Sequence, residues 1–342
     1  MTARPDDPGL VDRWGRRAVD LRVSLTDRCN LRCAYCMPAE GLPWLRNDRL
    51  LTPDETLRLV RVAVERLEVT DVRFTGGEPL LRRDLEEVVA GTAALRGPDG
   101  RPPAIAVTTN GIGLAERAEG LRAAGLDRAT VSLDTLDHDR FRAMTFRDRF
   151  ADAVAGVEAA VAAGLHPVKL NTVLLRNIND DEVVPLVEWA CARGAEVRFI
   201  EQMPLDAQGA WDRSVMVTAE EILAELRRVF DLTEVPGRGS APAQRWWVDR
   251  GGRRLGSVGV IASVSRPFCG DCDRTRLTAD GQLRDCLFAR TETDLRGLVR
   301  GGADDATVAE AWRAAMWAKK PGHGIDDPSF LRPGRSMSAI GG

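Results

Sequence analysis

Three cysteines, Cys29, Cys33 and Cys36, stand within eight residues in the spacing C-x3-C-x2-C. Thiolates bind soft metals and iron–sulfur clusters, and such clusters are commonly held by four cysteines. A cubane held by only three thiolates leaves one iron with an open position, much as a catalytic zinc keeps one position for its ligand. This first thiol triple therefore predicts a centre that can take an external ligand, with a zinc site or a buried thiol cluster as the alternative.

A second thiol triple, Cys269, Cys272 and Cys286, follows the spacing C-x2-C-x13-C. It too would leave one position of a cluster free. A zinc ion would need a fourth ligand, and none of the three histidines is near either triple in sequence. The seventh cysteine, Cys191, lies in a run with helical character, where we expect a small buried residue.

The turn Thr75-Gly76-Gly77-Glu78-Pro79 is the third candidate site and follows a short strand-like run. Paired glycines let the backbone approach a ligand closely, and the Glu78 carboxylate can accept hydrogen bonds from an amine. Taken alone, an ordinary turn between a strand and a helix explains these residues equally well.

Strand-like and helical segments alternate from about residue 18 to residue 230. The expected strands are 19–26, 72–75, 104–109, 129–134, 168–174 and 196–201, and the helical runs between them include 53–67, 82–95, 151–163 and 181–193. Such alternation implies a parallel sheet with right-handed crossovers. We predict an α/β fold with a partial (β/α)6 TIM-like barrel, since six units are too few for a closed eight-fold barrel.

The expected strands are polar on one face. In the first, Arg22 and Ser24 alternate with Leu21 and Val23, and the same split recurs in the second, fourth, fifth and sixth strands. Parallel strands covered on both faces would instead be continuously apolar. The pattern indicates a lumen that holds a charged ligand, with a solvent-exposed sheet face as the alternative.

The regular alternation of strand-like and helical segments ends at about residue 231. A Pro- and Gly-rich turn at 236–242 precedes an expected hairpin of 246–248 and 255–261, the second thiol triple, a helix at about 305–320 and a Gly/Pro-rich tail. We therefore predict two domains, 1–230 and 231–342, the second a smaller α+β region that carries the second triple.

Bulk composition excludes several classes of protein. The net charge of −3 provides no general attraction to nucleic acid or membranes. No apolar run approaches the roughly 20 residues of a membrane span, and the N-terminus lacks the apolar core of a signal peptide. We expect a cytoplasmic protein with reduced thiols. Only three of the 48 basic residues are lysines, so that the lysine in an expected strand, Lys169, is more informative than any single arginine.

The first thiol triple, with Tyr35 before its last cysteine, resembles the signature of the radical S-adenosylmethionine (SAM) superfamily. The resemblance implies that the three thiolates hold a 4Fe–4S cluster and that the amino and carboxylate groups of SAM occupy its fourth iron. It also implies SAM contacts at Tyr35, Gly77, Glu78, Ser132 and Met203.

Over residues 21–342 the sequence also resembles one particular family within this superfamily. The second triple ending in Cys286-Leu287-Phe288 and the tail Arg335-Ser336-Met337-Ser338-Ala339-Ile340-Gly341-Gly342 resemble a cyclase family of molybdenum-cofactor biosynthesis. The resemblance implies conversion of GTP to 3′,8-cyclo-7,8-dihydro-GTP, with a 5′-deoxyadenosyl radical removing the ribose 3′-hydrogen. It further implies a second 4Fe–4S cluster that binds guanine, and a Gly341-Gly342 tail that reaches into the site. The implied GTP contacts are Arg22, Arg73, Thr108, Lys169, Arg198, Arg274, Thr275 and Arg276.

The residues support such a site independently, because a triphosphate needs several converging cations, and Arg22, Arg73, Lys169 and Arg198 all lie on the polar faces of expected strands. The expected partners are a reducing protein such as flavodoxin or ferredoxin and the next enzyme, cyclic pyranopterin monophosphate synthase, with a monomeric or homodimeric chain. Two alternatives stay open: a radical SAM maturase with an auxiliary cluster that acts on a peptide, and a non-enzymatic iron–sulfur or zinc protein.

Overall fold

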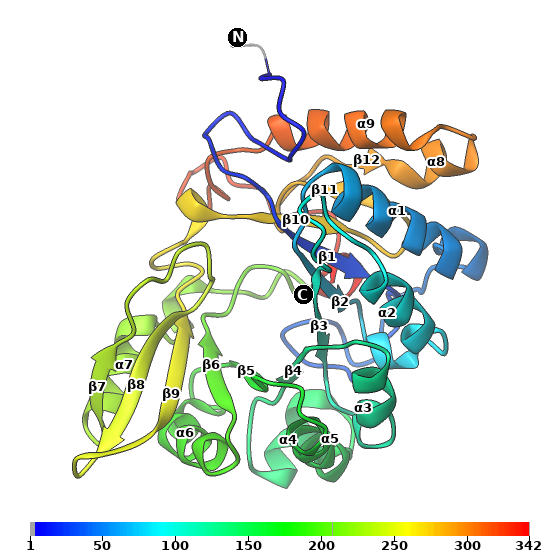
Figure 1. Cartoon of the computed structure of the whole chain (residues 1–342). Coiled ribbons are helices and arrows are strands. Elements are labelled where there is room, and N and C mark those ends of the chain that lie inside the picture. The colour runs from blue at the N-terminus through cyan, green and yellow to red at the C-terminus, as the bar shows by residue number, and fades with distance from the viewer. Residues whose placement is uncertain (1–3, 207, 342) are drawn as a thin grey trace.

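The computed structural model describes residues 4–206 and 208–341 and contains one curved sheet of twelve strands (Figure 1). The strands are β1 (Asp20–Ser24), β2 (Asp71–Thr75), β3 (Ala104–Thr109), β4 (Arg128–Ser132), β5 (Lys169–Val173), β6 (Glu196–Ile200), β7 (Asp231–Glu234), β8 (Gln244–Arg250), β9 (Arg253–Ile261), β10 (Arg274–Leu277), β11 (Gln282–Arg284) and β12 (Thr293–Asp294). Their order across the sheet is β12-β11-β10-β1-β2-β3-β4-β5-β6-β9-β8-β7.

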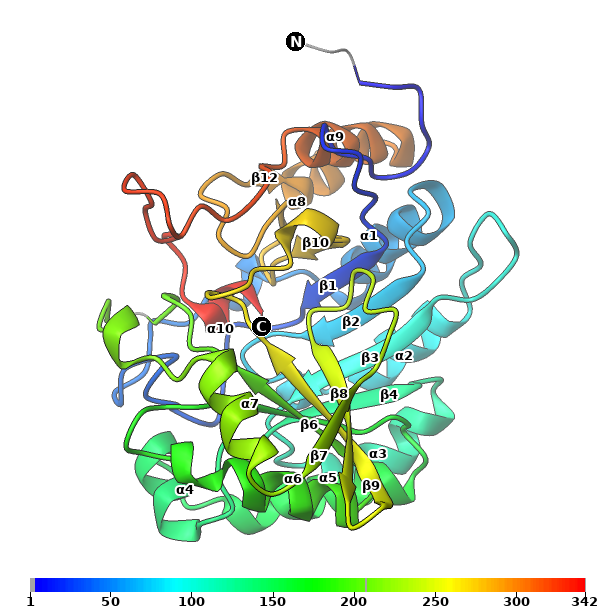
Figure 2. The same ribbon diagram turned by 90° about the vertical axis from the view of Figure 1, so that its left-hand side faces the viewer.

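Helices cover the outer face of this sheet (Figures 1 and 2). They are α1 (Pro53–Arg66), α2 (Leu85–Ala93), α3 (Leu114–Ala123), α4 (His138–Thr145), α5 (Phe150–Ala162), α6 (Val183–Ala192), α7 (Ala219–Arg227), α8 (Leu295–Arg300) and α9 (Asp305–Trp317). The short helix α10 (Met337–Ile340) instead lies on the inner side of the sheet (Figure 2). Strands β1 to β6 pair in parallel and in sequence order. The predicted α/β partial barrel is confirmed, and each of its six strands lies within two residues of its expected limits.

Local sequence explains where the helices begin and end. Thr52 caps α1 by accepting a hydrogen bond from the Glu55 amide, and the Glu55 side chain returns one to the Thr52 amide, with Pro53 at the first helical position. Gly125 and Gly164 follow α3 and α5 with φ of +107° and +72°, the left-handed region that glycine adopts without steric cost.

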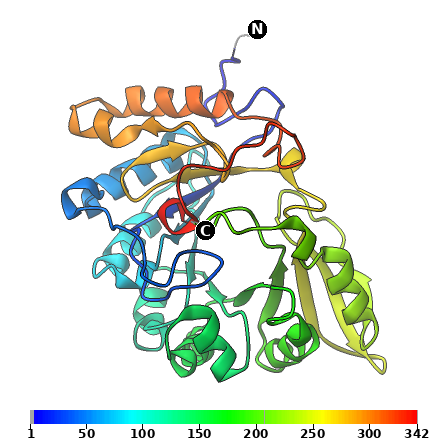
Figure 3. The same cartoon turned by 180° about the vertical axis from the view of Figure 1, so that it is seen from behind.

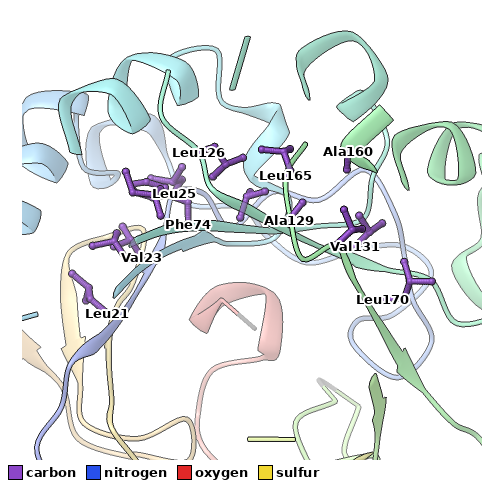
Figure 4. Packing of buried hydrophobic residues seen from close by; sticks show 14 of the residues in the cluster. Leu21, Val23, Leu25, Phe74, Leu126, Ala129, Val131, Ala160, Leu165 and Leu170 are labelled. Atoms are coloured by element: carbon purple, nitrogen blue, oxygen red, sulfur yellow. The ribbon is translucent and has the colours of Figure 1, made fainter. Parts of the chain in front are cut away.

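The apolar faces of the central strands pack against the outer helices (Figure 4). Leu21, Val23, Phe74, Val131 and Leu170 are all essentially inaccessible to solvent and belong to one hydrophobic cluster. Figure 4 also shows α10 on the other face of the strands. Period-two alternation therefore sends the polar side chains of the same strands into the inside of the curved sheet.

The segment after residue 230 lies at both edges of the six-stranded centre (Figure 2). The β8–β9 hairpin, longer than expected, joins the sheet through β9, which pairs in parallel with β6. At the other edge β10 pairs in parallel with β1. The division into domains at residue 230 stays a prediction.

The C-terminal tail turns back into the curve of the sheet (Figure 3). Both α10 and the C-terminal end lie between the two arms of the sheet in Figures 1 and 3. Among the described residues, no helix combines the length and the apolar character that crossing a membrane would require.

Candidate active site

The inner face of the sheet encloses a cavity of about 440 Å³. This size is typical of small-molecule sites, which measure about 300–1,000 Å³. The expected lumen is thus present, with the polar faces of the strands as its wall. Among the predicted site residues, those that line it are Arg22, Cys29, Cys33, Tyr35, Cys36, Arg73, Gly77, Thr108, Ser132, Lys169, Arg198, Met203, Arg274 and Arg276.

The first thiol triple lies at one end of the cavity, in the loop after β1. The Leu31 amide donates a hydrogen bond to the Cys29 sulfur at 3.4 Å. Burial raises the pKa of Cys29 to about 11 and that of Cys36 to about 12. Metal-free thiols with these pKa values are protonated at neutral pH, so that a metal must displace protons to bind them.

Tyr35, the only tyrosine of the chain, is held beside this triple. Its hydroxyl donates a hydrogen bond of 2.7 Å to Asp134 Oδ2, while the Val173 amide donates to Asp134 Oδ1 at 2.8 Å. Burial raises the pKa of Asp134 to about 6. The carboxylate therefore connects the cysteine loop to the carboxyl end of β5.

The glycine turn after β2 faces the cavity, whereas its carboxylate does not. A Cβ at Gly77 would lie 2.3 Å from the Arg28 carbonyl oxygen, so the close approach to the cysteine loop requires glycine. Glu78 is fully buried and accepts hydrogen bonds from the Leu80 amide, the Thr109 hydroxyl and the Asn110 amide at 2.7–2.9 Å. Burial raises the pKa of Glu78 to about 7. The side chain thus joins the ends of β2 and β3 outside the cavity.

Cationic side chains dominate the middle of the cavity. Among the described residues that line it, seven are cationic and three are carboxylates. Burial, together with Arg198 and Arg73 nearby, lowers the pKa of Lys169 to about 7. Burial and Arg22 lower the pKa of Arg73 to about 9. Collecting like charges in a buried space is costly, and a polyanionic ligand offsets that cost.

Three of these arginines have buried donors without a hydrogen-bond partner among the described residues. The donors are Arg22 Nε, Arg128 Nε, and Nε and Nη2 of Arg274. The Arg274 guanidinium lies over the Phe268 ring, 4.4 Å from its centroid. Because buried polar groups are nearly always satisfied in native proteins, these donors point to a ligand that accepts hydrogen bonds in the cavity.

Arg128 and Asp71 also line the cavity and were missed by the sequence analysis. Arg128 Nη2 donates a hydrogen bond of 2.8 Å to Asp71 Oδ1. Both residues begin their strands, one position before the expected starts at 129 and 72. The period-two pattern itself could have found them, since Arg128 continues the polar face of Thr130 and Ser132.

The second thiol triple lies near the opposite end of β1. Asp273, the residue after Cys272, accepts hydrogen bonds at its carbonyl oxygen from the amides of Val19 and Asp20, at 2.9 and 3.1 Å. These bonds place Cys272 beside the start of β1. Burial raises the pKa of Cys272, but the charges of Arg274 and Lys319 outweigh it and lower the value to about 7. The three cysteines do not line the cavity themselves, although Phe268, Leu287 and Arg274 beside them do.

Thr275 faces away from the cavity, since its hydroxyl oxygen accepts a hydrogen bond of 3.0 Å from Trp312 Nε1. Its neighbours Arg274 and Arg276 pair in register with Asp20 and Arg22 and share their inward face. Arg274 and Arg276 therefore face the cavity, and Thr275 between them faces the opposite side of β10.

The tail contacts both halves of the cavity. Met337 and Ser338 line it, and the Ser338 backbone contacts the Cys36 sulfur. Arg276 Nη1 donates a hydrogen bond of 2.9 Å to the Gly341 carbonyl, and Gly341 has a φ of +83°. Gly342 lies outside the described residues.

The donor set fits iron–sulfur clusters better than single metal ions. Within residues 4–206 and 208–341, no three Cys, His, Asp or Glu side chains are arranged to hold one metal ion. A cubane places each thiolate on a different iron, so its ligands do not converge on one point. The remaining thiol, Cys191, is half-buried and packs against the main core, where a Cβ at Gly256 would lie 2.7 Å from its sulfur.

Comparisons with known proteins agree with this geometry. Residues 23–190 match the family model of the radical SAM superfamily, and residues 195–325 match that of Molybdenum Cofactor Synthesis C. The structure of Streptococcus suis SuiB bound to S-adenosylmethionine aligns with a TM-score of 0.62 over 91% of this chain and 68% of that chain, at 12% identity. The fold and site thus define a radical SAM protein, a class that uses SAM and a 4Fe–4S cluster.

Sequence relatives identify the family within this class. A GTP 3′,8-cyclase of Corynebacterium glutamicum is 57% identical over 97% of this chain and 89% of its own length. One of Mycolicibacterium smegmatis is 59% identical over 99% of this chain and 93% of its own length. The chain belongs to the GTP 3′,8-cyclase family.

Proposed function

We propose that this chain converts GTP to 3′,8-cyclo-7,8-dihydro-GTP in the first step of molybdenum-cofactor biosynthesis. The observation that carries the proposal is the cavity, which extends from the first thiol triple past seven cationic side chains to residues beside the second triple. A peptide substrate would not need this concentration of positive charge. The likeness to SuiB, at 12% identity, is evidence of a common fold and carries no argument for a peptide substrate.

In this proposal Cys29, Cys33 and Cys36 hold a 4Fe–4S cluster, and SAM lies among Tyr35, Gly77, Ser132 and Met203. The Glu78 side chain would support this site from outside the cavity, by holding the turn in place. When bound, the cluster and SAM would supply one-electron reductive cleavage and, through it, a 5′-deoxyadenosyl radical able to take the ribose 3′-hydrogen.

The protein's own residues bind and orient the nucleotide. Guanidinium forks bind phosphate oxygens in pairs, and Lys169 adds a point charge. The triphosphate-binding residues would be Arg22, Arg73, Lys169, Arg198, Arg274 and Arg276. Thr108 accepts a hydrogen bond from Arg73 Nη1 at 3.4 Å and so orients it. Met337 and Ser338 of the tail form part of the cavity wall.

A second 4Fe–4S cluster at Cys269, Cys272 and Cys286 would bind the guanine base. We further propose a cytoplasmic enzyme, monomeric or homodimeric, that is reduced by a flavodoxin or ferredoxin. Its product would pass to cyclic pyranopterin monophosphate synthase.

Anaerobic reconstitution tests the proposal. We expect about eight iron atoms per chain, four from each cubane. SAM cleavage to 5′-deoxyadenosine should depend on GTP, and the cyclic nucleotide should form in step with it. Cleavage that ignores GTP would contradict the cyclase assignment and favour a different substrate, while about four iron atoms would contradict the second cluster.

A further inference from the structure

Lys319 is a buried cation next to the second thiol triple. The residue is only 3% exposed and lies two positions after the end of α9. Its Nζ donates hydrogen bonds to the Arg274 carbonyl at 2.8 Å, and to the carbonyl and the sulfur of Cys272 at 3.4 Å each. One ammonium group therefore contacts a cysteine sulfur and the backbone on both sides of Asp273.

The choice of lysine at this position is informative because the chain otherwise uses arginine. Lys169, Lys319 and Lys320 are the only lysines among 48 basic residues. An ammonium presents three donors around one nitrogen, which suits three acceptors grouped around one point. The planar guanidinium fork of arginine suits paired acceptors in one plane. The geometry around Lys319 favours the ammonium.

The position of this ammonium is fixed independently of the cysteine. Trp312 of α9 donates to the Thr275 hydroxyl at 3.0 Å, which ties the helix to β10. The Lys319 carbonyl accepts a hydrogen bond of 3.1 Å from Trp14 Nε1 in the N-terminal segment. Because these two hydrogen bonds fix the chain around Lys319, its ammonium group can determine the position of the Cys272 sulfur.

We infer that Lys319 is a positioning residue that holds the Cys272 thiolate and raises the reduction potential of the second cluster. The inference rests on the proposed assignment of a 4Fe–4S cluster to Cys269, Cys272 and Cys286. Hydrogen bonds to the sulfurs and net charge nearby set cluster potentials. A fixed positive charge stabilises the more negative, reduced state more than the oxidised state.

The test compares reconstituted full-length wild-type protein with Lys319→Met and Lys320→Met. Lys320 is the adjacent lysine and is exposed, so its substitution removes the same charge from solvent. Reductive titration followed by electron paramagnetic resonance reports both clusters. The signal that changes when GTP is added is assigned to the second cluster, and the signal that changes with SAM to the first.

We expect Lys319→Met to shift the potential of the GTP-sensitive signal to more negative values and to leave the SAM-sensitive signal in place. Lys320→Met should shift neither signal. An unshifted GTP-sensitive potential in Lys319→Met protein with full iron content would overturn the inference, and so would equal shifts in both lysine variants.

A Lys319→Gln variant, which retains a donor but no charge, covers the case in which the methionine variant does not fold. Its GTP-sensitive potential should also fall, and an unchanged value would overturn the inference. Selective loss of about four iron atoms with unchanged circular dichroism would support the role of Lys319 in holding the thiolate. Wild-type protein with only about four iron atoms would instead show that the proposed second cluster is wrong.

Discussion

Lys169 provides the sharpest test of the proposed GTP site. Burial and the neighbouring guanidinium groups of Arg198 and Arg73 lower its pKa to about 7. At pH 7 about half of the free protein therefore carries a neutral Lys169. A triphosphate favours the ammonium form, so GTP binding should take up a proton and the affinity should fall as the pH rises above 7.

The size of the effect follows from the contact that is lost. A hydrogen bond between charged groups contributes about 1.5–3 kcal/mol. At about 1.4 kcal/mol per tenfold, Lys169→Gln should raise the Kd for GTP by about 10- to 150-fold at pH 6. Above pH 7 the wild-type Kd should rise by up to about tenfold per pH unit and approach that of the variant.

Anaerobic calorimetry at several pH values, in buffers of different ionisation enthalpy, measures both the Kd and the proton uptake. Lys320→Gln, at an exposed position, is the matched control and should match wild type throughout. Equal Kd values and equal pH slopes in wild type and Lys169→Gln would refute a Lys169–phosphate contact.

Lys169→Gln should weaken GTP binding but stabilise the ligand-free protein. The pKa of Lys169 in the folded state, about 7, lies below its ordinary value of 10.5. The unfolded chain therefore binds the extra proton between these values, and wild-type stability rises with pH from about 7 to about 10.5. Lys169→Gln removes the buried charge and should be more stable than wild type at pH 7 and below, with a difference that vanishes near pH 10.5. Denaturant unfolding without ligand measures this difference.

Three further substitutions test other parts of the site. Glu78→Gln places an amide donor against the Asn110 amide and should lower the free energy of unfolding by about 2–4 kcal/mol in denaturant titrations, whereas Glu87→Gln on the exposed side of α2 should not. Arg128→Gln removes a cation that lines the cavity and, because the side chain is 29% exposed, should weaken GTP binding by only about three- to tenfold, measured by calorimetry. Arg335→Gln breaks contacts of 2.8–3.0 Å to two carboxylates that anchor the tail, so carboxypeptidase should remove the C-terminal residues faster while the unfolding midpoint changes little. Unchanged digestion would mean that other contacts hold the tail.

Local patterns account for the part of the fold that was predicted. Strand alternation has a period of two residues, so that Arg22 and Leu21 are assigned to opposite faces without knowledge of any partner. The capping box at Thr52 and the glycine after α3 are equally local signals. Arg128 was not predicted as a site residue because the expected strand 129–134 began one residue too late. The ends of strands are harder to predict than their centres.

The amino-acid sequence alone predicts both thiol triples and the polar strand faces that carry Arg22, Arg73, Lys169 and Arg198, because each depends on spacing within one segment. The packing of the folded chain is needed to show that Glu78 bonds to β3 outside the cavity and that Thr275 contacts Trp312. It alone brings Lys319 to a sulfur 47 residues away, and the tail to Arg276, 65 residues before Gly341. These contacts depend on how distant elements pack, and no periodicity within a segment encodes that.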